Sequence, residues 1–220
     1  MLPDQIASIE QLQKVRSVES GERLVDLAHF SPNVRSEVRR GDEGLSAIWV
    51  RETVARKLES IQMKLQALDP RYGLLVVEGY RSPSYQEKYY LQHLLLEHQK
   101  DPSLRLEVLM ERVHAFVALP SVAGHPTGGA VDVTLIWEGQ EVDMGGEIAD
   151  FSDPSLLPTY SPALSPAGTE NRKLLHDLMV SEHFAPYLGE WWHFSYGDRE
   201  WAAFYDLEET LYANTYVICS

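Results

Sequence analysis

The stretch that decides the fold runs Gly124-His125-Pro126-Thr127-Gly128-Gly129-Ala130-Val131-Asp132, and a second motif follows much later, Glu190-Trp191-Trp192-His193. Together they offer two imidazoles, one carboxylate as a third candidate ligand, and a further carboxylate three residues before a histidine. Catalytic zinc sites use three protein ligands, leave a fourth position for water, and keep an acidic residue nearby as general base. The sequence therefore predicts a metal centre with His125, Asp132 and His193 as candidate ligands, and mixed imidazole and carboxylate ligation favours zinc.

The residues around Asp132 predict a β-strand. The run from 129 to 137 is rich in β-branched residues and follows two glycines, which is typical of a strand entered from a turn. His125 then lies in the loop before the strand.

The second motif also favours a strand, because residues 190–196 are rich in aromatics. Side chains alternate along a regular strand, so an offset of three would send Glu190 and His193 to opposite faces. A helix would place both on one face, but the aromatic content favours the strand. We therefore expect Glu190 at an irregular strand start, which Gly189 permits.

The hydrophobic pattern predicts helices around these strands. Between Leu45 and Leu68, apolar residues recur at helical spacing at Val54, Leu58, Ile61 and Leu65. Further expected elements are a short strand at 24–27, a buried strand at 73–78, a helix from Ser82-Pro83 to about 98, a helix at about 102–117, and a helix capped by Thr169.

These elements predict an α+β fold in one domain over residues 1–220. We expect a small, mainly antiparallel sheet that carries Asp132 and His193, with helices packed around it and zinc in a cleft on the sheet. Residues 146–168 contain four prolines and two glycines and are too long for an ordinary connection. They predict a lid over the cleft or a mobile loop, and we favour the lid.

Composition narrows the classes of partner. The formal charge of -14 argues against nucleic acid or an anionic membrane, because both require a basic surface. The single cysteine, Cys219, cannot form an internal disulfide. No secretion signal and no apolar run of membrane-spanning length is visible, which predicts a cytoplasmic enzyme. A periplasmic enzyme whose signal had been removed would show the same sequence. The sequence does not indicate an oligomeric state.

The two metal motifs resemble those of the zinc D-alanyl-D-alanine dipeptidase family. The pattern His125-x-x-Gly128-x-Ala130-x-Asp132 followed by Glu190-x-x-His193 carries the likeness. Three more motifs match in order: Glu78-Gly79-Tyr80-Arg81-Ser82-Pro83, Val142-Asp143-Met144-Gly145 and Asn171-Arg172-Lys173-Leu174-Leu175. The resemblance covers about residues 40–205 and implies one Zn²⁺ per chain and D-Ala-D-Ala as a small-molecule substrate.

The resemblance also implies roles for further residues. Glu190 would act as general base and Arg81 would stabilise the oxyanion that forms at the carbonyl. Asp143 is a candidate for binding the free ammonium group of a dipeptide, or for supporting a histidine ligand. Tyr80 and Trp192 are expected to line or support the pocket. A serine usual in the family two residues before the first histidine ligand is replaced by Ala123, which leaves the contact to the substrate carboxylate open.

Two alternatives remain from the sequence. A D,D-carboxypeptidase or an L,D-type peptidoglycan peptidase on the same scaffold would need a pocket that is open at the amine end. A non-catalytic zinc-binding module is the second alternative, and the presence of both Glu190 and Arg81 argues against it.

Overall fold

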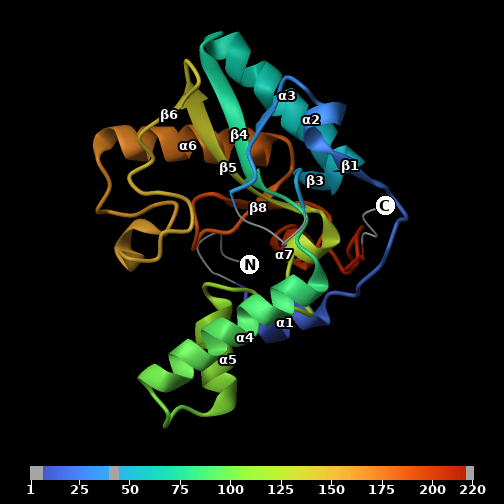
Figure 1. Ribbon diagram of the computed structural model, residues 1–220, viewed down its shortest axis with the longest axis vertical. Coiled ribbons are helices and arrows are strands. Elements are labelled where there is room, and N and C mark those ends of the chain that lie inside the picture. Colours follow the sequence, from blue (N-terminus) through green and yellow to red (C-terminus); the bar gives the residue numbers. More distant parts are fainter. Residues whose placement is uncertain (1–6, 40–44, 217–220) are drawn as a thin grey trace.

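The computed structural model describes residues 7–39 and 45–216 and has a mixed sheet at its centre (Figure 1). The strands lie in the order β2-β4-β5-β8-β7, and the short β6 pairs with the far end of β5. Only the β2–β4 pairing is parallel, and the others in this sheet are antiparallel. The predicted α+β fold with a mainly antiparallel sheet is confirmed. The strands are β2 (Arg35–Ser36), β4 (Tyr72–Glu78), β5 (Ala130–Trp137), β6 (Gln140–Glu141), β7 (Ala185–Pro186) and β8 (His193–Ser195).

One face of β5 packs in the hydrophobic core, and the other carries polar side chains. Val131, Val133 and Leu135 belong to the main hydrophobic core, which also contains the apolar residues of α3 (Glu52–Leu68). Because side chains alternate along a strand, Asp132 and Thr134 point to the opposite face. The core therefore fixes one face of β5 and leaves Asp132 on the other.

Two helices pack against the core face of the sheet and against each other, α3 and α6 (Pro166–Ser181). The predicted start of α3 at Leu45 is wrong, because 49–51 form β3 (Trp49–Arg51), which pairs with β1 (Leu24–Asp26). The predicted cap of α6 by Thr169 is also wrong. Ser165 caps the helix instead, since its side chain accepts from the backbone of Gly168.

The remaining helices lie at both edges of the sheet, since α2 (Leu27–Phe30) contacts the edge strand β2 and α7 (Arg199–Phe204) contacts β7 at the opposite edge. The predicted start of α4 (Pro83–Lys100) is confirmed, with Ser82 as N-cap and proline at the first position. It packs against α5 (Leu106–His114), and together they form a hairpin that projects from the body of the protein (Figure 1). The short elements are α1 (Ile9–Lys14), α2 (Leu27–Phe30), α7 (Arg199–Phe204), and the 3₁₀ turns η1 (His125–Thr127) and η2 (Pro154–Leu156).

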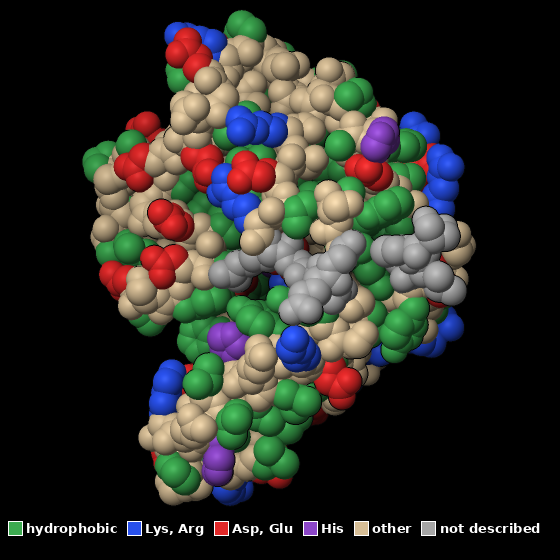
Figure 2. All heavy atoms as spheres, in the orientation of Figure 1, with side chains coloured by type: hydrophobic (Ala, Val, Ile, Leu, Met, Phe, Trp, Pro, Cys, Tyr) green, Lys and Arg blue, Asp and Glu red, His purple; other side chains and the backbone are tan. Residues whose placement is uncertain are grey.

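The surface carries charges of both signs. On the face shown in Figure 2, lysine and arginine side chains are scattered among acidic ones, without a single basic patch. Within 7–39 and 45–216, no helix has the length and apolar character needed to cross a membrane. The one cysteine, Cys219, lies outside the described residues.

Arg172 on α6 holds the long segment that precedes the helix. Its side chain is 1% exposed, and its guanidinium donates to the carbonyls of Met144, Leu156 and Pro158 at 2.6–2.8 Å. It also stacks on Trp191, with 5.1 Å from Cζ to the ring centroid. Burial lowers the pKa of Arg172 to about 10, so the group stays charged at neutral pH. One side chain therefore ties both ends of residues 144–158 to α6.

We predict that Arg172→Ala lowers the free energy of unfolding by about 2–4 kcal/mol, because three carbonyls lose a charged donor and a cavity forms. Urea unfolding followed by circular dichroism measures this. The exposed neighbour Lys173 is the matched control, and Lys173→Ala should change stability by no more than about 0.5 kcal/mol. Equal small effects of the two variants would contradict the proposed clamp.

Candidate metal centre and catalytic cavity

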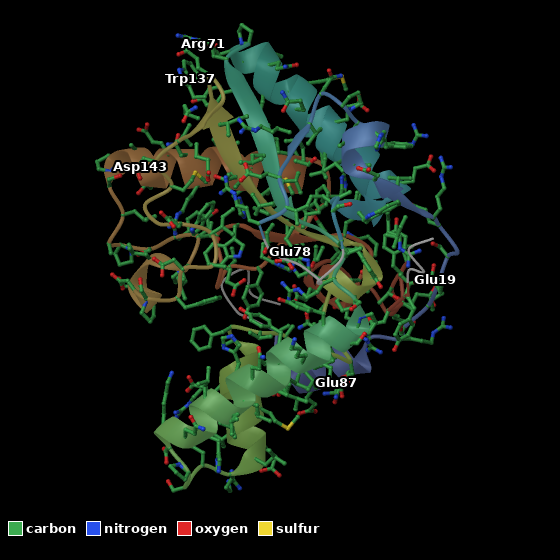
Figure 3. All side chains as sticks on the ribbon, viewed as in Figure 1. Glu19, Arg71, Glu78, Glu87, Trp137 and Asp143 are labelled. Atoms are coloured by element: carbon green, nitrogen blue, oxygen red, sulfur yellow. The ribbon has the colours of Figure 1, made fainter. Side chains whose placement is uncertain are left out.

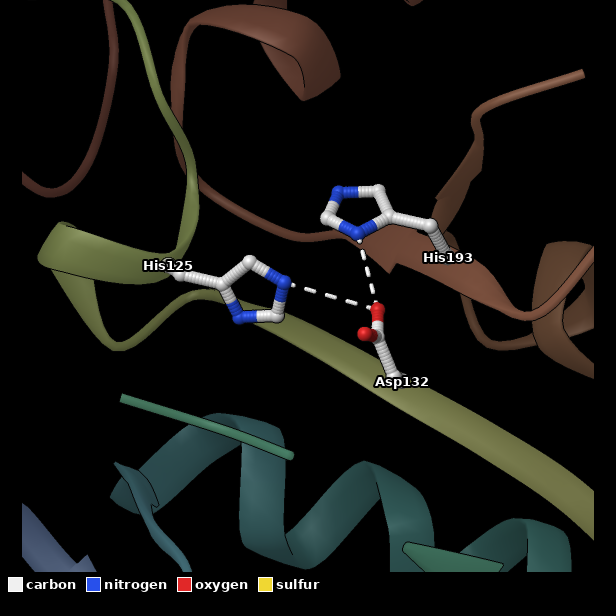
Figure 4. Close-up of side chains that lie close together, drawn as sticks. All are labelled: His125, Asp132 and His193. Carbon is white, nitrogen blue, oxygen red and sulfur yellow. Dashed lines mark hydrogen bonds and ion pairs between the residues drawn. The ribbon is translucent and has the colours of Figure 1, made fainter. Parts of the chain in front are cut away.

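Asp132 and His193 face each other on neighbouring strands. They are direct partners in the antiparallel register of β5 and β8, which brings their side chains together on one face. His125 reaches the same point from η1, where Gly128 ends the turn with a φ of 74° that favours glycine. Figure 4 shows the two imidazoles converging on one oxygen of the Asp132 carboxylate. The structure thus brings together the three predicted ligands.

The ring nitrogens have distinct partners. His125 Nδ1 lies 2.7 Å from the carbonyl oxygen of Gly79 and donates a hydrogen bond to it. The lone pair of Nε2 is then available to a metal ion, and this atom lies 3.4 Å from Asp132 Oδ1. His193 Nδ1 lies 2.9 Å from the same oxygen. One ligand atom from each residue lies within 4.8 Å of the others. Two imidazole nitrogens and one carboxylate oxygen in this arrangement suit a zinc site with an open fourth position.

The cluster is buried, and its charges stabilise one another. Burial acts to raise the pKa of Asp132, but His125 and His193 outweigh it, so this pKa lies far below its ordinary value. Burial acts to lower the pKa of His193, but hydrogen bonds to Asp132 and Glu200 raise it well above its usual value. The Asp132 carboxylate is therefore ionised and able to bind a cation.

Glu190 lies in a turn before β8, as expected for an irregular strand start. The backbone N–H of Glu190 donates to Tyr187, and that of His193 donates to Glu190. Both side chains of the Glu190-x-x-His193 motif consequently line one cavity. Burial raises the pKa of Glu190 to about 8, and its Oε1 is shielded from solvent with no partner among the described residues. Such a carboxyl is poised to exchange a proton near neutral pH.

Arg81 lines the same cavity from the loop after β4. Its Nε and Nη2 donate to Glu78 Oε1 at 2.8 and 2.7 Å, and Nη1 donates to Gln86 at 2.8 Å. Burial works against its charge, but Glu78 and then Asp132 outweigh burial and raise the pKa of Arg81 above its ordinary value. The guanidinium is therefore a fixed cation beside the metal cluster.

The cavity has further polar walls that the sequence did not reveal. Glu200, Tyr187 and His114 line it together with Trp192, one of the residues predicted from the sequence. Glu200 Oε2 lies 3.4 Å from His193 Nε2. Its position seven residues after His193 belongs to none of the recognised motifs, so no sequence signal marked it.

Two predicted substrate residues do not line this cavity. The Asp143 carboxylate accepts from the hydroxyl of Ser165 at 3.0 Å and from the backbone of Gly145 at 2.8 Å. Figure 3 shows Asp143 beside the N-terminal end of α6, away from the centrally placed Glu78. Asp143 therefore lies outside this cavity, because its chain segment is tied to α6. Tyr80 is buried, and its hydroxyl donates to the carbonyl of Thr215.

The segment predicted to be a lid contributes two residues to the cavity wall, Ala149 and Phe151. Phe151 packs edge to face against Trp192, with 6.2 Å between ring centroids. Ala123, which stands where the family usually has serine, also lines the cavity. Whether the segment opens and closes stays a prediction.

The sequence was compared with protein families and with individual proteins. Residues 34–216 match the family described as D-ala-D-ala dipeptidase, peptidase family M15. The chain is 32% identical over 203 residues to a D-alanyl-D-alanine dipeptidase of Synechocystis sp., covering 81% of both chains. It is 30% identical over 155 residues to a D-alanyl-D-alanine dipeptidase of Enterococcus faecalis, covering 67% of this chain and 73% of the relative.

Among solved structures, the LD-carboxypeptidase LdcB has a similar fold, with a TM-score of 0.50 and 19% identity over 86% of this chain and 76% of that one. The fold, the ordered motifs and the extent of the sequence match agree with the predicted resemblance. The chain belongs to the D-Ala-D-Ala dipeptidase family of M15 peptidases.

Proposed function

We propose that this chain is a zinc-dependent dipeptidase that hydrolyses D-Ala-D-Ala, with one Zn²⁺ held by His125, Asp132 and His193. The observation that carries the proposal is the convergence of three ligand atoms in a cavity that Glu190 and Arg81 also line. Family membership and the names of the two relatives support the same substrate.

His125, Asp132 and His193 would hold the zinc ion, which would supply Lewis-acid chemistry for the peptide carbonyl and a water molecule with a pKa lowered to about 7. Glu190 accepts a proton from the attacking water and delivers it to the leaving amine, a role worth about 10²–10⁴-fold in rate. Burial raises the pKa of Glu190 to about 8 in the metal-free cavity, which brings its proton exchange close to neutral pH.

Arg81 faces the charge that develops on the carbonyl oxygen. The guanidinium is held by Glu78 and Gln86 before substrate arrives, so little reorganisation is needed during the reaction. Because Arg81 cannot lose its proton at neutral pH, it stabilises an oxyanion by charge and by N–H donation.

The amine end of the substrate distinguishes a dipeptidase from a carboxypeptidase. The cavity wall carries the carboxylate of Glu190, which attracts a free ammonium group. Phe151 and Trp192 add an apolar wall. We propose that the site closes around a free dipeptide, whereas a carboxypeptidase would leave room for a longer chain.

The metal assignment predicts that His125→Ala and His193→Ala lose bound zinc, while wild type holds one ion per chain, because each variant removes one of three ligands. Metal analysis after dialysis at low free zinc measures this. His98 is exposed on α4, so His98→Ala is the matched control and should keep full zinc content. Unchanged zinc in both ligand variants would reject the assignment.

If Glu190 is the general base, Glu190→Gln should keep its zinc but lose at least about 10²-fold in kcat. The amide has nearly the same volume as the carboxylate but cannot accept the proton. Steady-state kinetics together with metal analysis test this. Glu87→Gln makes the same chemical change at an exposed position on α4 and should leave kcat unaltered. Near-normal turnover of Glu190→Gln would remove the residue from the mechanism.

The dipeptidase proposal predicts that acetylating the amine of D-Ala-D-Ala lowers kcat/KM at least tenfold. Loss of a charged hydrogen bond worth about 1.5–3 kcal/mol accounts for one to two decades, and the acetyl group adds bulk. The comparison includes D-Ala-D-Ala, its N-acetyl form and a pentapeptide ending in D-Ala-D-Ala. Equal hydrolysis of all three would favour the carboxypeptidase. Asp143→Asn should show the wild-type preference, because Asp143 lies outside the cavity.

A further inference from the structure

A third carboxylate lies behind the metal cluster. Glu200 is on α7, and its side chain is 14% exposed. It lines the cavity with Glu190 but stands on the far side of His193, because it approaches Nε2 whereas Asp132 approaches Nδ1. The mechanism proposed above does not use Glu200.

The orientation of His193 requires an acceptor at this position. Nδ1 lies 2.9 Å from Asp132 Oδ1, so it is the ring nitrogen that faces the metal position. A neutral imidazole that ligates through Nδ1 carries its proton on Nε2. Among the described residues, two side-chain oxygens lie within reach of Nε2: Glu200 Oε2 at 3.4 Å and Ser195 Oγ at 3.5 Å.

Ser195 does not compete for the proton, because its hydroxyl points to the same carboxylate. Ser195 Oγ donates to Glu200 Oε2 at 3.2 Å. One oxygen of Glu200 therefore faces two donors, the ring N–H of His193 and the hydroxyl of Ser195. A carboxylate that receives both fixes the rotation of the imidazole about its side-chain bonds.

The position of Glu200 is itself well fixed. Asp198 caps α7, since its Oδ1 accepts from the backbone of Trp201 at 2.9 Å. Asp198 also packs closely against Gly124, where a side chain would collide with Oδ2. The start of α7 is thereby attached to the loop that carries His125. The helix that supports one ligand is thus in contact with the loop that supplies another.

We propose that Glu200 is a positioning residue that accepts a hydrogen bond from the Nε2–H of His193 and holds this ring with Nδ1 toward the metal position. The proposal rests on the proposed zinc site. Carboxylates that orient a histidine ligand raise its basicity and fix its tautomer, and their loss typically costs about 10–100-fold in metal affinity or activity.

The test measures zinc affinity by competition with a chelator for wild type, Glu200→Gln and Glu200→Ala. Both variants should bind zinc about 10–100-fold more weakly, with a larger loss for alanine, because the glutamine amide oxygen can still accept from Nε2 without the charge. Glu208→Gln is the matched control, since Glu208 is exposed in the same C-terminal region, and it should bind zinc like wild type. Circular dichroism checks that each variant is folded.

Kinetics at saturating zinc separate positioning from substrate binding. A positioning role predicts that KM for D-Ala-D-Ala stays within about threefold of wild type while kcat falls. Zinc affinity of Glu200→Gln equal to wild type, with a raised KM, would overturn the proposal and make Glu200 a substrate contact. If wild type binds no zinc, the proposed function fails together with this role. If wild type binds zinc and hydrolyses the dipeptide but neither Glu200 variant changes zinc affinity, only the role of Glu200 fails.

Discussion

The site depends on a single cross-strand pair, Asp132 on β5 opposite His193 on β8. Pairing in an antiparallel sheet fixes the distance between the two side chains to within the reach of one shared ion, without help from any loop. The neighbouring residues Val131 and Phe194 lie in the main core. A slip of one residue in the register would bury Asp132 among apolar side chains and expose those core residues. The hydrophobic free energy of the core therefore specifies the geometry of the polar site on the opposite face.

The balance of charge in the cavity explains why a divalent cation suits it. Asp132, Glu190 and Glu200 contribute carboxylates to the wall, and the fixed cation, Arg81, is shared with Glu78. Buried charges of one sign are costly unless a partner compensates them. Without metal, protonation of Glu190 reduces the negative charge, since burial raises the pKa of this carboxyl to about 8. A zinc ion bound by His125, Asp132 and His193 would replace that proton as the compensating charge, so we infer that metal binding and the ionisation of Glu190 are coupled.

Much of the fold and most of the site could be predicted from local signals. Runs of β-branched residues after Gly128-Gly129 identified β5, and a serine before proline identified the start of α4. The clustering of the metal residues followed from motif spacing, and the fold confirms their proximity. Asp143 lies outside the cavity, which its motif could not show, because the motif fixes the local turn but not the direction in which the following chain runs. That direction depends on Arg172, which holds the carbonyls of residues 144–158 from a helix further along the chain.

Glu200 was missed for a related physical reason. A residue that orients a histidine ligand only has to place a carboxylate oxygen near the ring nitrogen that does not bind the metal. Many different chain paths can bring a carboxylate to that position. Its sequence position is therefore weakly constrained, whereas the ligands must present defined atoms to one point. In this protein the path is set by the cap at Asp198 and by the space that Gly124 leaves for it. The strand pair fixes the positions of Asp132 and His193, and the contact between α7 and the His125 loop holds Glu200 beside the ring of His193.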